Sequence, residues 1–257
     1  MSVPLAFVIL APKASISSSK LRAGFVELFP EVGVPTIASE KGGTISFDFP
    51  GERSVLATLV PKPYPREELE GFAERSWMWQ KPKAALLAHA GHMICAGVPT
   101  DDPIEGAKLL TMAVAAICKA CPQTIAVLWS SSELLIPADA FAGLAEQLPE
   151  ALPVYLWVNV FVGKNDAGTT SGFTKGLEFL GHMEFETNNA SDEVGDLRER
   201  FLNLAAYVLE NGPVIEDGNT VGADENERIR VIYSDSEFGN EGTAMRLDYE
   251  SLRKKRR

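Results

Sequence analysis

The alternation of apolar and polar residues changes its period several times along the chain. Residues 5–10 form a continuous apolar run, which predicts a short strand that is covered on both faces. Residues 44–49 alternate with a period of two, and residues 55–60 form a second strand-like segment after a Pro-Gly-Glu turn. These two segments predict a β-hairpin.

Helical spacing of apolar residues marks a second group of segments. Serines at positions 15–19 offer N-caps for the first of them, and Pro30 ends it. Asp101, Asp102 and Pro103 form a start signal for another helix, and Gly212 follows the last one as a stop signal. We expect helices over residues 20–29, 66–75, 101–119, 137–148 and 191–210.

The remaining segments are less regular. Residues 84–98 fit a helix or a strand, but the glycines at 91 and 97 argue against a helix, and residues 92–95 suit a strand. Residues 168–172 are small and polar and predict a loop, and residues 178–186 predict a turn followed by a strand. Branched and aromatic residues predict strands over 125–129, 154–162, 228–233 and 244–249.

Helices and strands are interleaved irregularly, which favours an α+β fold with mixed or antiparallel sheets and helices packed on them. We expect one continuous domain over residues 1–257, with residues 1–137 and 153–250 as two candidate halves of related structure. Residues 251–257, which include Arg253 to Arg257, are predicted to be a flexible basic tail.

Composition and charge narrow the class of protein. Hydrophobic residues make up 46% and charged residues 23%, as in folded globular proteins. A net charge of -11 disfavours nucleic acid and anionic membranes as partners and suits a basic protein. No apolar stretch approaches the length of a membrane span, and the first residues lack the basic start of a signal peptide. Three cysteines cannot build a disulfide framework, so we expect a cytoplasmic protein.

Two short motifs offer metal or redox chemistry. Cys118 and Cys121 have redox spacing, but they fall at the C-terminal end of a predicted helix, where the dipole does not favour a thiolate. We interpret them as packed cysteines. His89 and His92 would point to opposite faces of a strand, which weakens a shared metal site.

The segment from His182 to Glu186 is the strongest candidate for chemistry. If it is extended, His182, Glu184 and Glu186 share one face, and Met183 and Phe185 share the other. An imidazole and two carboxylates can bind a transition metal or carry out acid–base steps. A half-exposed strand has the same pattern, and the carboxylates can equally meet basic groups of a partner.

Known catalytic signatures do not occur. The loop predicted at 168–172 lacks the Gly-Lys-Ser/Thr order of a phosphate-binding loop, and neither a Gly-x-Ser-x-Gly nor a His-Glu-x-x-His motif is present. We therefore assign no catalytic residue and expect no cofactor and no bound metal.

Several separated pieces of the chain stand out together: residues 6–10, Trp157, 170–173, 176–177, 181–186, 206–209 and 217–222. In these pieces the chain resembles a known bacterial family, catalogued as domain of unknown function 4261. The resemblance extends over nearly the whole chain, with the more specific pieces in the C-terminal half. The family has no established activity, so the resemblance implies no catalytic residue.

Three hypotheses for function follow. The first is an acidic, non-catalytic binding protein, such as a bacterial immunity protein or adaptor that neutralises a basic toxin or secreted effector, as in toxin–antitoxin or type VI secretion systems. The second is a metal-assisted hydrolase that uses the His/Glu cluster, and the third is a self-associating module. The binding hypothesis is favoured, with these candidate residues: His182, Glu184, Glu186, Thr170, Ser171, Asp217 and Thr220.

Overall fold

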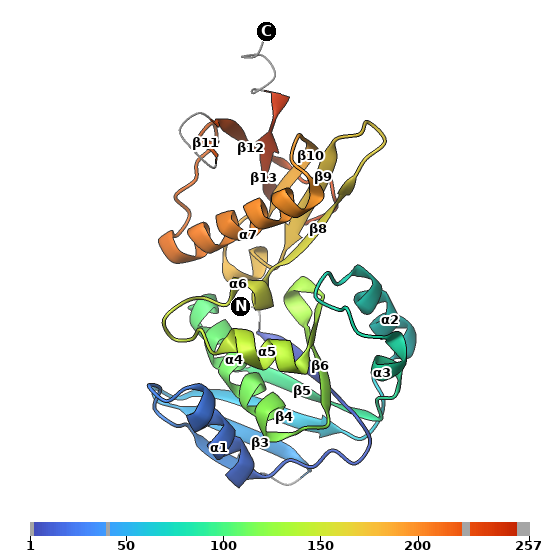
Figure 1. Cartoon of the computed structure of the whole chain (residues 1–257). Coiled ribbons are helices and arrows are strands. Elements are labelled where there is room, and N and C mark those ends of the chain that lie inside the picture. Colours follow the sequence, from blue (N-terminus) through green and yellow to red (C-terminus); the bar gives the residue numbers. More distant parts are fainter. Residues whose placement is uncertain (1–2, 40–41, 223–226, 251–257) are drawn as a thin grey trace. The chain divides into compact units, whose positions relative to one another are not determined.

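The computed structural model describes residues 3–39, 42–222 and 227–250, and Figure 1 shows the whole chain. The chain divides into two compact units, Met1–Trp157 and Val158–Arg257. The boundary lies later than the predicted end of the first half at residue 137, because the helices after that residue pack with the first unit. The predicted basic tail, 251–257, lies outside the described residues.

The first unit is built on a seven-stranded antiparallel sheet, and the described strand pairs all run antiparallel. The predicted hairpin is present as β3 and β4. The segment at 92–95 lies in a strand, β5, as the glycines indicated. In sheet order the strands are β2 (Thr36–Ser39), β3 (Thr44–Phe49), β4 (Arg53–Val60), β5 (Gly91–Gly97), β1 (Leu5–Leu10), β6 (Thr124–Trp129) and β7 (Leu134–Pro137).

Helices cover both faces of strand β1. Helix α4 (Pro103–Ala120) packs on β1 and β5, and α1 (Ser18–Leu28) and α5 (Ala138–Ala145) lie against α4 (Figure 1). Helix α2 (Arg66–Arg75) and helix α3 (Lys83–Leu87) pack in a second cluster that includes Ile9 of β1. Val8, Ile9 and Leu10 are all buried, so the prediction of a strand covered on both faces is confirmed.

The second unit holds a six-stranded mixed sheet with one long helix on it. Strands β10 and β13 run parallel, and the other described pairs are antiparallel. Helix α7 (Val194–Asn211) packs on β8 and β9 (Figure 1). In sheet order the strands are β11 (Thr220–Val221), β12 (Ile229–Asp235), β13 (Thr243–Asp248), β10 (Phe185–Ala190), β9 (Thr170–Lys175) and β8 (Asn159–Lys164).

Helix ends follow the caps that the sequence offered. The carboxylate of Asp102 accepts hydrogen bonds from the N–H groups of Ile104 and Glu105 at 3.0 Å each, which starts α4. Gly212 ends α7 with a positive φ of 81°. These local signals explain why the predicted helices fall close to the observed ones.

The long strand predicted over residues 154–162 is wrong in its first half. Val154–Trp157 forms a short helix, α6, and β8 begins at Asn159. The helical turn buries Trp157, whose Nε1 donates a hydrogen bond to the hydroxyl of Thr111 on α4 at 2.8 Å. This tertiary contact overrides the strand preference of the branched and aromatic residues.

The loop predicted over residues 168–172 is correct for its first two residues and wrong from Thr170 onward, because Thr170–Lys175 is strand β9. The turn lies just before it, where the side-chain oxygen of Asn165 accepts hydrogen bonds from the N–H groups of Ala167 and Thr169 at 3.1 Å each. Gly168 supplies the positive φ of this turn. The small polar residues therefore continue as a strand.

The predicted fold class is confirmed, since two sheets with helices packed on them make an α+β protein. Within the described residues, none of the helices combines the length and apolar character that crossing a membrane requires.

Candidate functional site

The segment that carries His182, Glu184 and Glu186 connects β9 to β10 in the second unit. The expected turn and strand are both present, but the condition that the whole segment is extended is not met. Strand β10 begins only at Phe185, after a short 3-10 turn over Glu178–Leu180. The three side chains therefore do not lie along one strand, and each has its own surroundings.

Glu184 is 4% exposed, and its carboxylate holds the β9–β10 connection. Its Oε1 accepts hydrogen bonds from the N–H groups of Gly176 at 2.7 Å and Glu178 at 3.0 Å, and Oε2 accepts one from the Thr174 hydroxyl at 2.7 Å. Burial raises the pKa of this carboxyl above its ordinary value, although the hydrogen bonds act in the opposite direction. The side chain therefore stabilises a turn of its own unit.

Glu186 holds a different segment, the loop between β12 and β13. It is 1% exposed. Its carboxylate accepts hydrogen bonds from the hydroxyl of Ser236, from the N–H of Glu237 at 2.9 Å and from the side-chain amide of Asn240 at 3.1 Å. The two glutamates thus fix two separate loops and do not converge on one cleft.

His182 takes part in neither of these two sets of hydrogen bonds. Its Nδ1 is buried and makes no hydrogen bond among the described residues, and burial lowers the pKa of the imidazole. In the part of the chain that the structure describes, no three His, Cys, Asp or Glu side chains lie close enough to hold a metal ion. The predicted cluster is therefore two structural carboxylates beside a partly buried imidazole.

Thr170 and Ser171 lie on β9, with their side chains alternating between its faces. Thr170 is buried, and its hydroxyl donates a hydrogen bond to the backbone oxygen of Asp192. Ser171 is half-buried. Thr170 thus helps to fix the segment that leads into α7.

Asp217 and Thr220 lie at the opposite edge of the sheet. Both are exposed. The carboxylate of Asp217 accepts a hydrogen bond from the N–H of Tyr233 at 2.9 Å, and Thr220 pairs with Arg230 in the β11–β12 hairpin. The candidate residues are therefore spread over the unit, and Thr170 alone among them belongs to the network described next.

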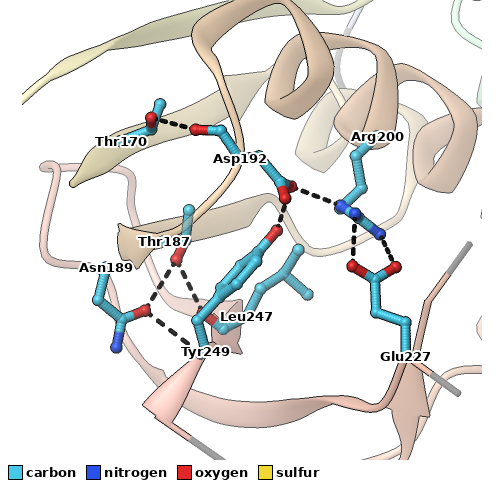
Figure 2. A network of polar contacts seen from close by, with 8 residues as sticks. All are labelled: Thr170, Thr187, Asn189, Asp192, Arg200, Glu227, Leu247 and Tyr249. Carbon is cyan, nitrogen blue, oxygen red and sulfur yellow. Dashed lines mark hydrogen bonds and ion pairs between the residues drawn. The ribbon is translucent and has the colours of Figure 1, made fainter. Parts of the chain in front are cut away.

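Figure 2 shows a network of polar contacts centred on Arg200 of α7. The Nε–H of Arg200 donates to Asp192 at 2.8 Å, and its two terminal nitrogens donate to the two oxygens of Glu227 at 2.9 Å each. The hydroxyl of Tyr249 donates to the same Asp192 oxygen at 2.7 Å. The network joins the start of α7, the β11–β12 hairpin and the end of β13.

The charges in this network are partly removed from water. Arg200 is 16% exposed and Asp192 is 13% exposed at their side chains. Burial alone would lower the pKa of Arg200, but the hydrogen bonds to Asp192 and Glu227 raise it above its ordinary value. Burial, together with the hydrogen bond to Asp192, raises the pKa of Tyr249. Arg200 therefore stays charged and is neutralised within the protein.

Sequence reasoning missed this network. A usable signal was present, because Arg200 stands three residues after Leu197 and four before Leu204, at the spacing of the apolar stripe of α7. A charged residue at a core-facing position predicts an internal carboxylate partner. The partner itself, Glu227, lies 27 residues further on and is not predicted by any local pattern.

A cavity of about 320 Å³ lies beside the network, between α7 and β11. Acidic side chains and an asparagine stand along its helical side, and apolar side chains contribute to its wall. Residues that line it include Asp196, Glu199, Arg200, Asn203, Leu204 and Val221.

The first unit holds the other histidines and the cysteines. His89 bonds to the backbone oxygens of Leu86 at 2.8 Å and Tyr64 at 3.0 Å, and His92 bonds to that of Lys62 at 2.9 Å. The two rings are therefore held by separate carbonyl groups.

The three cysteines are free thiols, as expected for packed side chains. Burial raises the pKa of Cys95 to about 12 and raises that of Cys118 as well. Cys118 and Cys121 stand at the C-terminal end of α4, as the sequence indicated. The thiolate forms of Cys95 and Cys118 are therefore disfavoured at neutral pH.

Comparison with known proteins gives one match. Neither the curated proteins nor the solved structures contain a match to this chain. The match to a family model covers the end of β9 through β13, including Glu184, Glu186 and Arg200. Residues 173–248 match the family described as Domain of unknown function (DUF4261), which confirms the resemblance inferred from the sequence over this segment.

Proposed function

We propose that this chain is a non-catalytic binding protein whose acidic surface holds a basic protein, as a bacterial immunity protein or adaptor holds a toxin or secreted effector. The observation that carries the proposal is the uneven distribution of charge. The second unit, residues 158–257, contains 19 acidic and 12 basic residues, five of the basic ones in 251–257, whereas residues 1–157 contain 16 and 12. The excess negative charge therefore belongs mainly to the second unit.

An excess of one sign on a folded surface favours a partner of the other sign. Complementary charge speeds encounter and disfavours partners of like charge. Such a protein needs no bond-making chemistry, only a rigid scaffold. The buried hydrogen bonds of Glu184, Glu186 and Arg200 supply rigidity to the loops of the acidic unit.

The contacts of the two glutamates also weigh against the hydrolase alternative. A general base or metal ligand needs carboxylate oxygens that face a substrate or a metal. Both oxygens of Glu184 and both oxygens of Glu186 accept hydrogen bonds from their own chain. The binding proposal requires no other role for them.

Affinity purification of the tagged full chain from its native host tests the proposal. We expect a basic protein to be recovered in stoichiometric amount at low salt and to dissociate as salt is raised above about 0.1 M, where charge interactions are screened. Co-expression should then suppress the toxicity of that partner. Recovery of no stoichiometric partner, or turnover of a substrate by the purified chain, would overturn the proposal.

A further inference from the structure

The outer face of helix α7 is a continuous polar stripe in the acidic unit. Leu197, Phe201, Ala205 and Val208 are buried toward the sheet. The residues on the opposite side recur every three or four positions and are exposed, and Tyr207 reaches 49% exposure. The stripe consists of Asp196, Glu199, Asn203, Tyr207 and Glu210.

The helix dipole favours Asp196 in the first turn, but two other features of the charges on this stripe are unfavourable for the isolated helix. Asp196 and Glu199 are like charges three residues apart, and such neighbours repel each other on a helix surface. Glu210 lies in the last turn, where the helix dipole disfavours a negative charge, and that turn has no basic residue. No ion pair between described residues engages any of the three.

Two helices of the first unit each pair an exposed carboxylate with a lysine. Glu27 on α1 pairs with Lys119 at 2.8 Å, and Asp139 on α5 pairs with Lys81 at 2.7 Å. Of the two arginines on α7, Arg198 and Arg200, the second is already bound to carboxylates outside the stripe. The carboxylates on the outer face of α7 are thus left without an ion pair among the described residues. This is the pattern expected where a partner supplies the missing positive charge.

The cavity described above lies beside the stripe and offers room for a side chain of a partner. Asp196 and Glu199 stand on its helical side, and Leu204 and Val221 offer apolar surface within it. Arg200 lines it too, and its charge is already paired with Asp192 and Glu227. A lysine or arginine side chain matches this combination, because its methylene stem packs on apolar surface while its charged end meets carboxylates. Tyr207, further along the same face, is the kind of residue that anchors interfaces.

We propose that the outer face of α7, together with this cavity, is the docking surface for the basic partner, with a lysine or arginine of the partner entering between α7 and β11. This inference rests on the proposed function and deepens it by naming the surface. The occupant is a basic polypeptide, which matches the stripe in charge and the cavity in chemistry.

The test uses the full chain and a fluorescein-labelled oligolysine peptide, with binding followed by anisotropy at about 0.05 M salt. The variant D196K/E199K reverses two charges of the stripe. The matched control, E67K/E68K, reverses two exposed carboxylates in the first turn of α2 in the other unit. A third variant, D196N/E199Q, removes the charges with little change of shape, and thermal unfolding checks that each variant is folded.

We expect D196K/E199K to weaken binding at least about tenfold and the control to change it by less than about twofold. The affinity of D196N/E199Q for the peptide should lie between those of wild type and D196K/E199K. Equal losses in the reversal and the control, or an unchanged affinity in the α7 variants, would overturn the docking surface while leaving the binding function in place. If the wild-type chain does not bind the peptide, the proposed acidic binding function itself fails.

Discussion

Arg200 meets Glu227 through both terminal nitrogens of its guanidinium, at 2.9 Å for each nitrogen–oxygen pair. The same side chain uses its Nε–H on Asp192. A lysine cannot reproduce this geometry, because its ammonium is a point charge without a planar fork. The pair therefore depends on arginine in particular and not only on a positive charge.

We expect Arg200→Lys to destabilise the protein by about 2 kcal/mol, since it leaves partly buried carboxylates with fewer hydrogen bonds. Urea unfolding of wild type and variant measures this difference. Arg230→Lys, at an exposed position on β12, is the matched control and should change stability by less than about 0.5 kcal/mol. Equal effects of the two changes would show that the fork contributes nothing particular.

The fold could be predicted where local signals decide it. The apolar run at residues 5–10, the cap at Asp102 and the stop at Gly212 fix element ends through contacts within a few residues. Prediction failed where distant contacts decide. Residues 154–157 turn into a helix because Trp157 reaches Thr111, 46 positions away in the chain.

The same distinction applies to the candidate site. A period-two pattern identified Glu184 and Glu186 as a pair worth attention, and both belong to the segment that matches the family. Their roles in fixing loops come from hydrogen bonds, from Gly176 to Glu184 and from Ser236 to Glu186, which lies 50 residues before Ser236. An argument from spacing along the sequence does not predict these contacts. Residues that fix loops and residues that do chemistry share one sequence pattern, and only the contacts distinguish them.

Glu184 should make stability depend on pH. Because burial raises the pKa of its carboxyl in the folded state, the folded protein binds the proton more tightly than the unfolded chain does. The contribution of Glu184 to the free energy of unfolding is then lost as pH rises from the pKa of a glutamate in the unfolded chain, about 4.3, through the higher pKa in the folded protein.

The variant E184Q removes this dependence and retains an acceptor for the N–H groups of Gly176 and Glu178. Thermal unfolding from pH 4 to pH 8 should show the melting temperature of E184Q improving relative to wild type as pH rises. A difference between the two proteins that does not change with pH would contradict this account of the buried carboxyl.

Glu186 should control the order of the β12–β13 loop. Its carboxylate accepts hydrogen bonds from the N–H of Glu237 and from the side-chain amide of Asn240. Phe238 of the same loop stacks on Phe173, with 5.2 Å between the ring centroids. Glu186→Ala leaves those donors unpaired, so amide hydrogen exchange at residues 236–240 should accelerate by about tenfold or more. Exchange in α4 of the other unit serves as the internal control and should be unchanged.

The thiols should be inert in the folded protein. With the pKa of Cys95 raised to about 12 by burial, its thiolate is scarcely populated at pH 8, and the Cys118 shift has the same direction. Titration with a chromogenic disulfide reagent should label the folded chain far more slowly than the chain in denaturant, where three thiols react. Rapid labelling of Cys118 in the native protein would restore the redox interpretation of its motif.

Gly172 lies on β9, where its backbone pairs with Val162 of the neighbouring strand β8. A Cβ added there would lie 2.4 Å from the backbone oxygen of Phe161 and 2.6 Å from a methyl carbon of Val162. The first neighbour is backbone, so the strands would have to separate, and such overpacking costs on the order of 1–3 kcal/mol. We therefore expect Gly172→Ala to lower the unfolding free energy by about that amount.

Gly163→Ala is the control for this change, because the glycine lies on the adjacent strand β8 and a Cβ there would meet nothing within 4 Å. Alanine restricts the unfolded chain more than glycine does, so this variant should be neutral or stabilised by a few tenths of a kcal/mol. The two variants are compared with wild type by urea unfolding, and the unfolding free energy is taken to depend equally on urea concentration in all three proteins. If the two alanine variants are equally stable, β9 does not pack against β8 as closely as the structure shows, and residues 168–172 behave as the loop that their composition predicts.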